Sequence, residues 1–297
     1  MRDSNRRLTC LVCAGLTVVL AVSGTNAARA STDANAPKIL DQAMAQAAAL
    51  CEPLAVLVVE LGQSRADEVA LSRFESSEAK QRAGKLVTYV LDLAISRNRA
   101  SAARFHPIET PLLVCLSAKG VIISRDEKPL SKKLLLRRID EAFEKGPGLD
   151  GQLVALQQRA GADPNPSAAR LELADFLLAH GNALEAIPQL AAVAHCEPCG
   201  DAQRVRAWVA LGRAHLWIGE PEKARVEAEN LIAELGIRLP EARAGGQLVL
   251  GIHDANLNRP ALARQEFEEA MRLAPETSYA KEAGEMLRDL RKGWVSK

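Results

Sequence analysis

The sequence has no surplus of positive charge. Its 38 lysines and arginines are balanced by 37 acidic residues, and residues 31–297 alone carry 34 basic and 36 acidic residues, a net charge of −2. A general nucleic-acid binder needs excess lysine and arginine to neutralise phosphates. The charge balance therefore argues against nucleic acid as a partner.

The apolar run near the N-terminus is too short to serve as a membrane anchor. It covers residues 8–23, and these 16 residues fall short of the roughly 20 that span a bilayer. Three arginines precede the run and small residues ending in Ala30 follow it, which is the layout of a cleaved signal peptide. The sequence thus predicts a signal peptide at 1–30, a flexible leader at 31–36, export to the periplasm or secretion, and no stable membrane anchor after cleavage.

Cysteine is sparse and catalytic motifs are missing. Two of the six cysteines fall within the signal peptide, none lies between Cys51 and Cys115, and only Cys196 and Cys199 are close in sequence. No nucleophile and base stand in a recognisable motif, and we interpret His106 as a loop histidine. The sequence predicts a protein that is not an enzyme, and it gives no reason to expect a cofactor.

The first half of the chain alternates helical and strand patterns. Apolar residues recur at helical spacing in 37–50, and 54–61 is a Val- and Leu-rich run typical of a strand buried on both faces. The patterns that follow predict, in order, a helix over 66–83, a strand over 86–93, a helix over 95–105, strands over 112–116 and 121–124 joined in a hairpin, and a helix over 134–143. This order predicts a mixed sheet with helices on both faces.

This order of elements resembles the thioredoxin fold over residues 37–145, with Pro111 at the start of the strand that opens the hairpin. The family's proline is cis and lies beside the active site, so the resemblance implies a cis proline at Pro111. The family's Cys-x-x-Cys pair follows the first long strand, where this chain has Gly62-Gln63-Ser64-Arg65-Ala66-Asp67. The resemblance therefore implies a thioredoxin-like sandwich without its redox centre; another α/β sandwich is the alternative.

The second half contains a repeat. After 146–166, interpreted as a linker because it opens with Gly146-Pro147-Gly148, the composition shifts to Ala, Leu, Glu and Arg. The middle copy resembles the tetratricopeptide (TPR) consensus W-x2-L-G-x6-G-x4-A at Trp208, Leu211, Gly212, Gly219 and Ala224, and the alanines at equivalent positions in the three copies are Ala186, Ala224 and Ala263.

We therefore expect three TPR-like repeats and a capping helix over 167–297. The predicted fold class is α/β followed by all-α, a thioredoxin-like sandwich followed by a helical solenoid. The whole arrangement resembles the YbbN-type fusion, which implies protein binding and chaperone-like protection of clients rather than oxidoreduction. The predicted signal peptide is a departure from that family. The cytoplasmic partners of that family therefore do not indicate the partners of this chain.

The resemblance to TPR proteins also suggests a binding surface, because the first helices of such repeats line the concave face. The residues at those positions are Asp175, Arg206, Val209, Arg213, Trp217 and Asn256. Two arginines flanked by a tryptophan can pair with a carboxylate while an apolar side chain is buried. We expect a protein partner here, bound as an extended peptide or a helix; alternatively, Trp217 only covers the adjacent repeat.

Cys196 and Cys199 allow three interpretations. They form a local structural disulfide or stay inert thiols, they make a thiol-disulfide exchange centre, or they bind a metal together with His195 and the remote His253. We expect the first, because the pair falls at the end of a helix, where the dipole raises a thiol pKa. Exchange is the alternative function. Cys115 is expected in the core, opposite the middle of the first strand and unbridged to Cys51.

Overall fold

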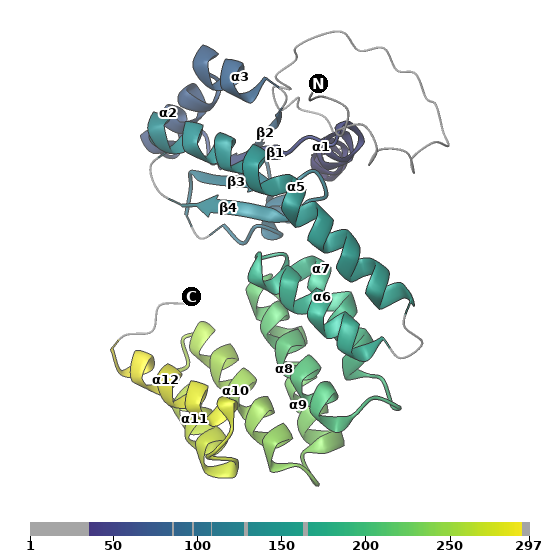
Figure 1. Ribbon diagram of the computed structural model, residues 1–297. Coiled ribbons are helices and arrows are strands. Elements are labelled where there is room, and N and C mark those ends of the chain that lie inside the picture. Colours follow the sequence, from purple (N-terminus) through teal and green to yellow (C-terminus); the bar gives the residue numbers. More distant parts are fainter. Residues whose placement is uncertain are drawn as a thin grey trace.

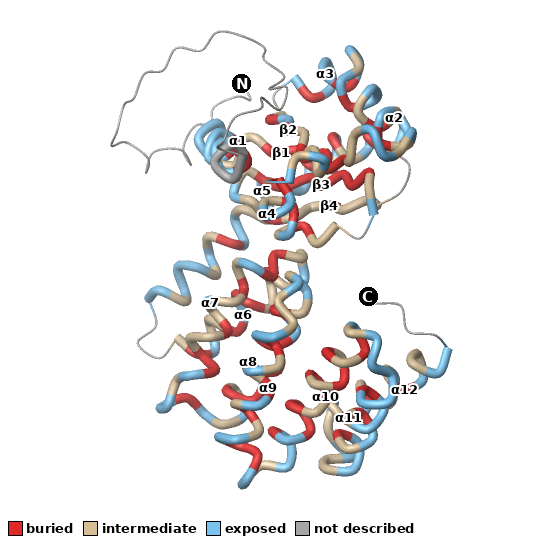
Figure 2. Tube along the Cα trace, turned by 180° about the vertical axis from the view of Figure 1, so that it is seen from behind, coloured by how far each residue is buried: buried red, intermediate tan, exposed pale blue. Residues whose placement is uncertain are grey.

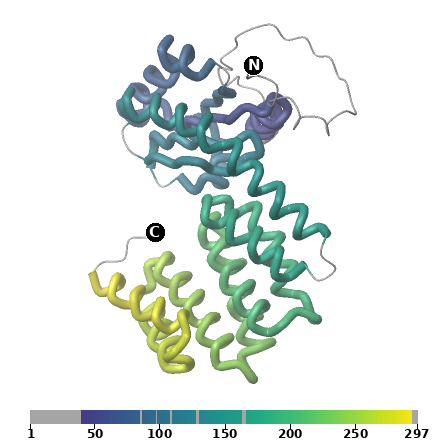
Figure 3. Tube along the Cα trace, viewed as in Figure 1, coloured from purple at the N-terminus to yellow at the C-terminus, as the bar shows by residue number. Residues whose placement is uncertain are grey.

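The computed structural model describes residues 36–84, 86–96, 98–107, 109–127, 130–162 and 166–292. The signal peptide expected at 1–30, and the leader apart from Ala36, lie outside these ranges. None of the helices in the described ranges is long and apolar enough to cross a membrane. The chain forms a mixed α/β region followed by an all-helical region whose helices pack one after another (Figures 1 and 3).

The α/β region is built on a four-stranded mixed sheet of order β2-β1-β3-β4. Strand β1 pairs parallel with β2 and antiparallel with β3, and β3 pairs antiparallel with β4. The elements are α1 (Ala36–Leu50), β1 (Leu54–Val59), α2 (Arg65–Phe74), α3 (Ser77–Ala83), β2 (Val87–Asp92), α4 (Asn98–Ala103), β3 (Leu112–Leu116), β4 (Ile122–Asp126) and α5 (Lys132–Ala162).

Helices cover both faces of this sheet, as the sequence predicted. Alternate residues of the strands pack on one face with α1 and α4, and the other residues pack on the opposite face with α2, α3 and α5. All six residues of β1 are buried, which explains its unbroken apolar run. The single helix expected over 66–83 is two helices, because the Ser76 hydroxyl accepts a hydrogen bond from the Ala79 amide and starts α3 anew.

The register of β1 and β3 differs from the expected one. Cys115 lies opposite Ala55, near the start of β1, rather than opposite the middle of that strand. The shift arises because β1 ends at Val59, two residues earlier than its apolar run, so that the pairing begins with Leu112 opposite Val58. Cys115 is fully buried and is not bonded to Cys51.

Helix α5 runs through the residues interpreted as a linker. Pro147 lies inside this helix, which continues to Ala162 and carries its apolar face from the sheet into the helical region. Leu149, Leu153 and Leu156 pack there against the core of the helical region. Burial of this face outweighs the low helix propensity of the Gly-Pro-Gly segment. The two regions thus share one continuous helix instead of a flexible connection.

The helical region consists of consecutive helices that pack in sequence order. They are α6 (Ser167–Ala179), α7 (Ala183–Ala194), α8 (Asp201–Trp217), α9 (Pro221–Leu235), α10 (Pro240–Asn256), α11 (Pro260–Leu273) and α12 (Ser278–Arg291). Buried residues, coloured red in Figure 2, occur along these helices and form the cores in which neighbouring helices meet. Gly212 of α8 permits a close approach to α10, because a Cβ placed there would lie 2.8 Å from Val249 Cγ1.

The β3–β4 turn docks onto the α6–α7 turn. The buried Asn182 side chain donates to the Gly120 carbonyl at 2.8 Å and accepts from the Ile122 amide at 3.0 Å. His180 Nδ1 lies 3.2 Å from the Ile122 carbonyl, and fully buried Val121 belongs to the core of the helical region. Because buried polar groups that form hydrogen bonds fix geometry, this contact holds the two regions in one orientation.

Candidate functional site

A groove of about 740 Å³ lies in the helical region. Helices α8, α10 and α12 supply most of its lining, and the α6–α7 turn and one residue of the α/β region complete it. The lining residues are His106, Leu178, Gly181, Ala183, Arg206, Val209, Ala210, Arg213, Ala214, Leu216, Trp217, Ile252, Asn256, Tyr279, Glu282, Met286, Asp289 and Lys292. Most are apolar, and the charged ones come mainly from α8 and α12. This composition is typical of a site that buries an apolar group and orients it with a few polar contacts.

Most of the residues expected at a partner site line this groove. They are Arg206, Val209, Arg213, Trp217 and Asn256. Asp175 does not line it, but its carboxylate forms an ion pair with Arg206. Val209 is only 4% exposed and packs on Gly245, where a Cβ would lie 2.6 Å from Val209 Cγ2. Val209 is therefore part of the buried floor of the groove, and Gly245 of α10 allows α8 and α10 to pack closely beneath it.

Both groove arginines already hold a carboxylate. Arg206 pairs with Asp175 of α6, and Arg213 Nη1 lies 2.8 Å from Glu282 Oε1 of α12. Helix α10 packs against both α8 and α12, so the second pair spans the groove above α10. The side chains of Arg206 and Arg213 are 57% and 49% exposed. Ion pairs this exposed contribute about 0–1 kcal/mol, so a ligand carboxylate can replace either partner at little cost.

Trp217 contacts the α/β region. Its ring stacks on the His106 imidazole with centroids 5.6 Å apart and planes 28° apart, and the Arg125 guanidinium lies 5.8 Å from the indole centroid. Trp217 nevertheless remains 36% exposed and lines the groove. Neither sequence interpretation of Trp217 included this contact, because nothing near Trp217 in the sequence points to His106.

The α12 wall was missed, although the sequence holds a signal for it. Positions 279, 282, 286 and 289 on α12 repeat the spacing of positions 206, 209, 213 and 216 on α8, and all eight line the groove. Helix α12 therefore offers the same face to the groove as α8 does, besides capping the array. Burial raises the pKa of Tyr279 in this wall to about 12, so its hydroxyl stays protonated at neutral pH.

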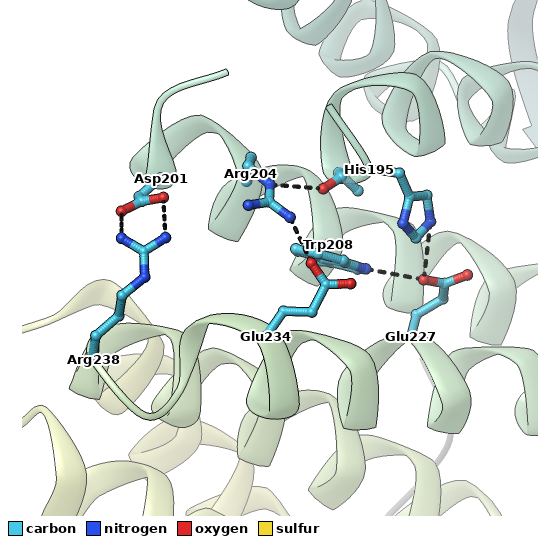
Figure 4. A network of polar contacts seen from close by, with 8 residues as sticks. His195, Asp201, Arg204, Trp208, Glu227, Glu234 and Arg238 are labelled. Carbon is cyan, nitrogen blue, oxygen red and sulfur yellow. Dashed lines mark hydrogen bonds and ion pairs between the residues drawn. The ribbon is translucent and has the colours of Figure 1, made fainter. Parts of the chain in front are cut away.

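Cys196 and Cys199 are joined by a disulfide in the α7–α8 connection, away from the groove lining. Polar contacts surround this connection (Figure 4). Arg204 Nε donates to the Ala194 carbonyl at 3.1 Å, Arg204 Nη2 contacts Glu234 at 2.7 Å, and Trp208 Nε1 donates to Glu227 at 3.1 Å. These contacts tie α7, α8 and α9 together at the point where the disulfide closes the loop.

The α/β region has no thiol at the turn after β1. Ser64 caps α2 by accepting a hydrogen bond from the Ala66 amide, and the Thr110 hydroxyl donates to the buried Asp67 carboxylate at 3.0 Å. Thr110 precedes Pro111 across a cis peptide bond. Burial, as the largest effect, raises the pKa of Asp67. The polar groups at this turn thus serve to hold α2 against the loop before β3.

No protein-family model matches the chain, and no curated protein matches it. Within the described ranges, no group of three or more His, Cys, Asp or Glu side chains is arranged to hold a metal ion. The metal interpretation of Cys196 and Cys199 finds no support, because a disulfide leaves neither thiolate available as a ligand.

Proposed function

We propose that this protein is an exported, non-catalytic peptide-binding module whose groove holds an extended segment of a protein partner. The observation that carries the proposal is the groove itself, in which an apolar floor lies between two exposed arginines of α8. The ligand we propose combines a large apolar side chain with one or two carboxylates. The apolar group would lie on the floor, and the carboxylates would take the places of Asp175 and Glu282.

An extended chain fits this groove better than a helix. A helix with its side chains is about 10–12 Å across. The side chains of Arg213 and Glu282 meet across the groove at 2.8 Å, so an occupant displaces this ion pair, and a helix would also have to fit its full width between α8 and α12. An extended chain is narrower and presents alternate side chains to the floor and to the solvent.

We further propose a TPR-like solenoid for the helical region and a thioredoxin-like sandwich for the α/β region. Ala186, Ala224 and Ala263, the alanines at equivalent positions of the proposed repeats, are all 0% exposed, as small residues at a close helix approach should be. The sheet order and the cis peptide bond before Pro111 support the sandwich. Ser64 and Asp67 would then stand where an exchange enzyme carries its thiols.

Binding can be tested with defined peptides. We suggest fluorescein-labelled peptides of about twelve residues, roughly 40 Å when extended. Each carries one Leu or Phe and one Glu at a varied separation, with a twin in which Gln replaces Glu. Fluorescence anisotropy should show tighter binding of the Glu member of a pair. Arg213→Glu should weaken this binding about tenfold or more, which corresponds to about 1.4 kcal/mol.

Arg225→Glu is the matched control, because Arg225 is also exposed and pairs with Glu222 and Glu229, but it lies on α9 outside the groove lining. The proposal is wrong if no peptide binds, or if Arg213→Glu and Arg225→Glu have equal effects. Export is tested separately by expressing the chain with its own N-terminus. The mature protein should begin at Ser31 and lie outside the cytoplasm.

A further inference from the structure

We infer that His106 of the α/β region is a ligand-contacting residue of the groove, so that one binding site spans both regions of the chain. This inference rests on the proposed function and names a specificity determinant of that same site. The ligand is the extended peptide proposed above. Its large apolar side chain would lie on the floor, at the end of the groove where His106 meets Trp217.

The position of His106 carries the inference. It is the one residue of the α/β region in the described groove lining, and its ring stacks on Trp217 with centroids 5.6 Å apart. Trp217 is still 36% exposed, so the stacked pair leaves aromatic surface open to the groove. A side chain that enters this end therefore meets two rings, one from each region. Aromatic surface of this kind is where binding energy concentrates in protein interfaces.

The backbone of His106 supports the same conclusion. Its φ is 44°, in the left-handed region where glycine is favoured and other residues are strained. Arg125 holds this conformation by donating a hydrogen bond to the His106 carbonyl, and it also pairs with Glu127. Strained residues that are fixed by their surroundings cluster at functional sites. Glycine would fit this backbone conformation without strain but has no side chain. The strained histidine instead places an imidazole at the edge of the groove.

The electrostatic surroundings favour an apolar ligand group at this position. Burial, and next the nearby Arg125, lower the pKa of His106, while Glu127 acts in the opposite direction. The imidazole is therefore neutral at pH 7 and offers an uncharged ring to the groove. An uncharged ring packs well against a second aromatic group, so peptides with Phe should depend on His106 more than peptides with Leu.

The α/β region presents His106 from a fixed place. Asn182 holds the β3–β4 turn through Gly120 and Ile122, and Arg104 Nη2 of the α/β region contacts Glu185 of α7 at 2.7 Å. Arg125, on β4, acts as a positioning residue because it fixes the His106 carbonyl and lies over Trp217. Because this wall of the groove is already fixed, little conformational entropy is lost when a ligand binds, which is the benefit of preorganisation.

The test replaces the ring and keeps the backbone. His106→Gly suits the positive φ, so the fold should survive, and urea unfolding checks this. His195→Gly is a control for the loss of an imidazole that contacts a tryptophan, because the His195 ring meets Trp208 edge-on with ring centroids 5.3 Å apart, outside the groove lining. Against the best Phe peptide of the panel, we expect His106→Gly to weaken binding about two- to twelvefold, the range of an aromatic pair. His195→Gly should leave affinity unchanged.

NMR adds a readout that a purely structural role would not change. The chain has five histidines, and the His106 ring signals can be assigned by their absence from His106→Gly. Addition of the Phe peptide should shift these signals and leave those of His195 in place. If Arg213→Glu weakens binding while His106→Gly does not, the inference is overturned and the proposed function stands. If the wild-type chain binds no peptide, both are overturned.

Discussion

Trp208 and Trp217 lie on the same helix, α8, yet the first is 1% exposed and the second is 36% exposed. Trp208 belongs to the core of the helical region and donates a hydrogen bond to Glu227. Trp217 lines the groove and touches the α/β region through His106. The two tryptophans therefore occupy a core position and a groove position within one helix.

Their truncation should give different losses. Trp208→Ala removes a fully buried ring, so the free energy of unfolding should fall by about 3–5 kcal/mol. Trp217→Ala should cost less, about 1–3 kcal/mol, because part of this ring is already exposed, and it should also weaken peptide binding. Urea unfolding and anisotropy on the same two samples measure this. Similar stability losses for both variants would contradict a groove role for Trp217.

The second prediction concerns the contact between the two regions. Asn182→Ala leaves the Gly120 carbonyl and the Ile122 amide without their side-chain partner, so the free energy of unfolding should fall by about 1–3 kcal/mol. Hydrogen exchange of the Ile122 amide should accelerate before that of the β1 amides. Gln152→Ala, at an exposed position of α5, is the control. Unchanged exchange at Ile122 would show that the docking does not depend on Asn182.

The third prediction separates the cysteines by their environment. Burial raises the pKa of Cys115 to about 12, so at pH 8 it is a protonated thiol inside the sheet. Iodoacetamide should label exposed Cys51 in the folded protein and Cys115 only after unfolding, as mass spectrometry of peptides can show. Cys196 and Cys199 should be labelled only after reduction.

An insulin reduction assay extends this prediction to function. Cys196 directly follows His195, the C-cap of α7, a position that does not stabilise a thiolate, whereas Cys199 directly precedes Gly200, the N-cap of α8. The pair therefore lacks an attacking first cysteine at a helix N-terminus. We therefore expect no turnover above background. Turnover that disappears in Cys196→Ser would instead support the thiol-disulfide exchange alternative.

The fourth prediction follows from buried Asp67, whose raised pKa gives a definite pH dependence. Between pH 3.8 and the raised value, the folded protein binds more protons than the unfolded chain, so the free energy of unfolding falls as pH rises. Asp67→Asn lacks this titration. It should be more stable than wild type at pH 7, and the advantage should vanish as pH falls below 3.8.

Asp140→Asn is the control of opposite sign. Hydrogen bonds from Arg82 lower the pKa of Asp140, so its contribution is present above pH 3.8 and is lost as pH falls through the lowered value. This variant should be slightly less stable than wild type at pH 7, because the ion pair is exposed. If Asp67→Asn and Asp140→Asn shift stability in the same direction, burial does not dominate at Asp67.

Local patterns were enough to place the strands and most helices. The apolar runs located β1, β2 and β3 to within two residues at either end, because buried strands need continuous apolar sequence. The course of α5 could not be predicted in this way. Its Gly-Pro-Gly segment has the composition of a break, and only the packing of Leu149 and Leu153 against the helical core shows why the helix continues.

The groove was predictable in part for a similar reason. The resemblance to the TPR consensus implies which face of a helix points inward, so the α8 residues could be chosen from the sequence. His106 could not, because its place in the groove depends on how two regions dock, and docking is a tertiary property without a local sequence signature. The ion pair of Arg213 with Glu282 was missed because α12 was treated as a cap only.

The docking through Asn182 also bears on how freely the sequence can diverge. Asn182 forms hydrogen bonds with main-chain atoms of the hairpin turn and not with its side chains. Residues 118 and 119 can therefore be substituted without loss of these hydrogen bonds. Gly120 is different, because its φ is 83° and a Cβ there would lie 3.0 Å from Met44 Cε. Related chains that keep this arrangement should therefore retain an asparagine on the helical side and a glycine on the other, while the rest of the turn drifts.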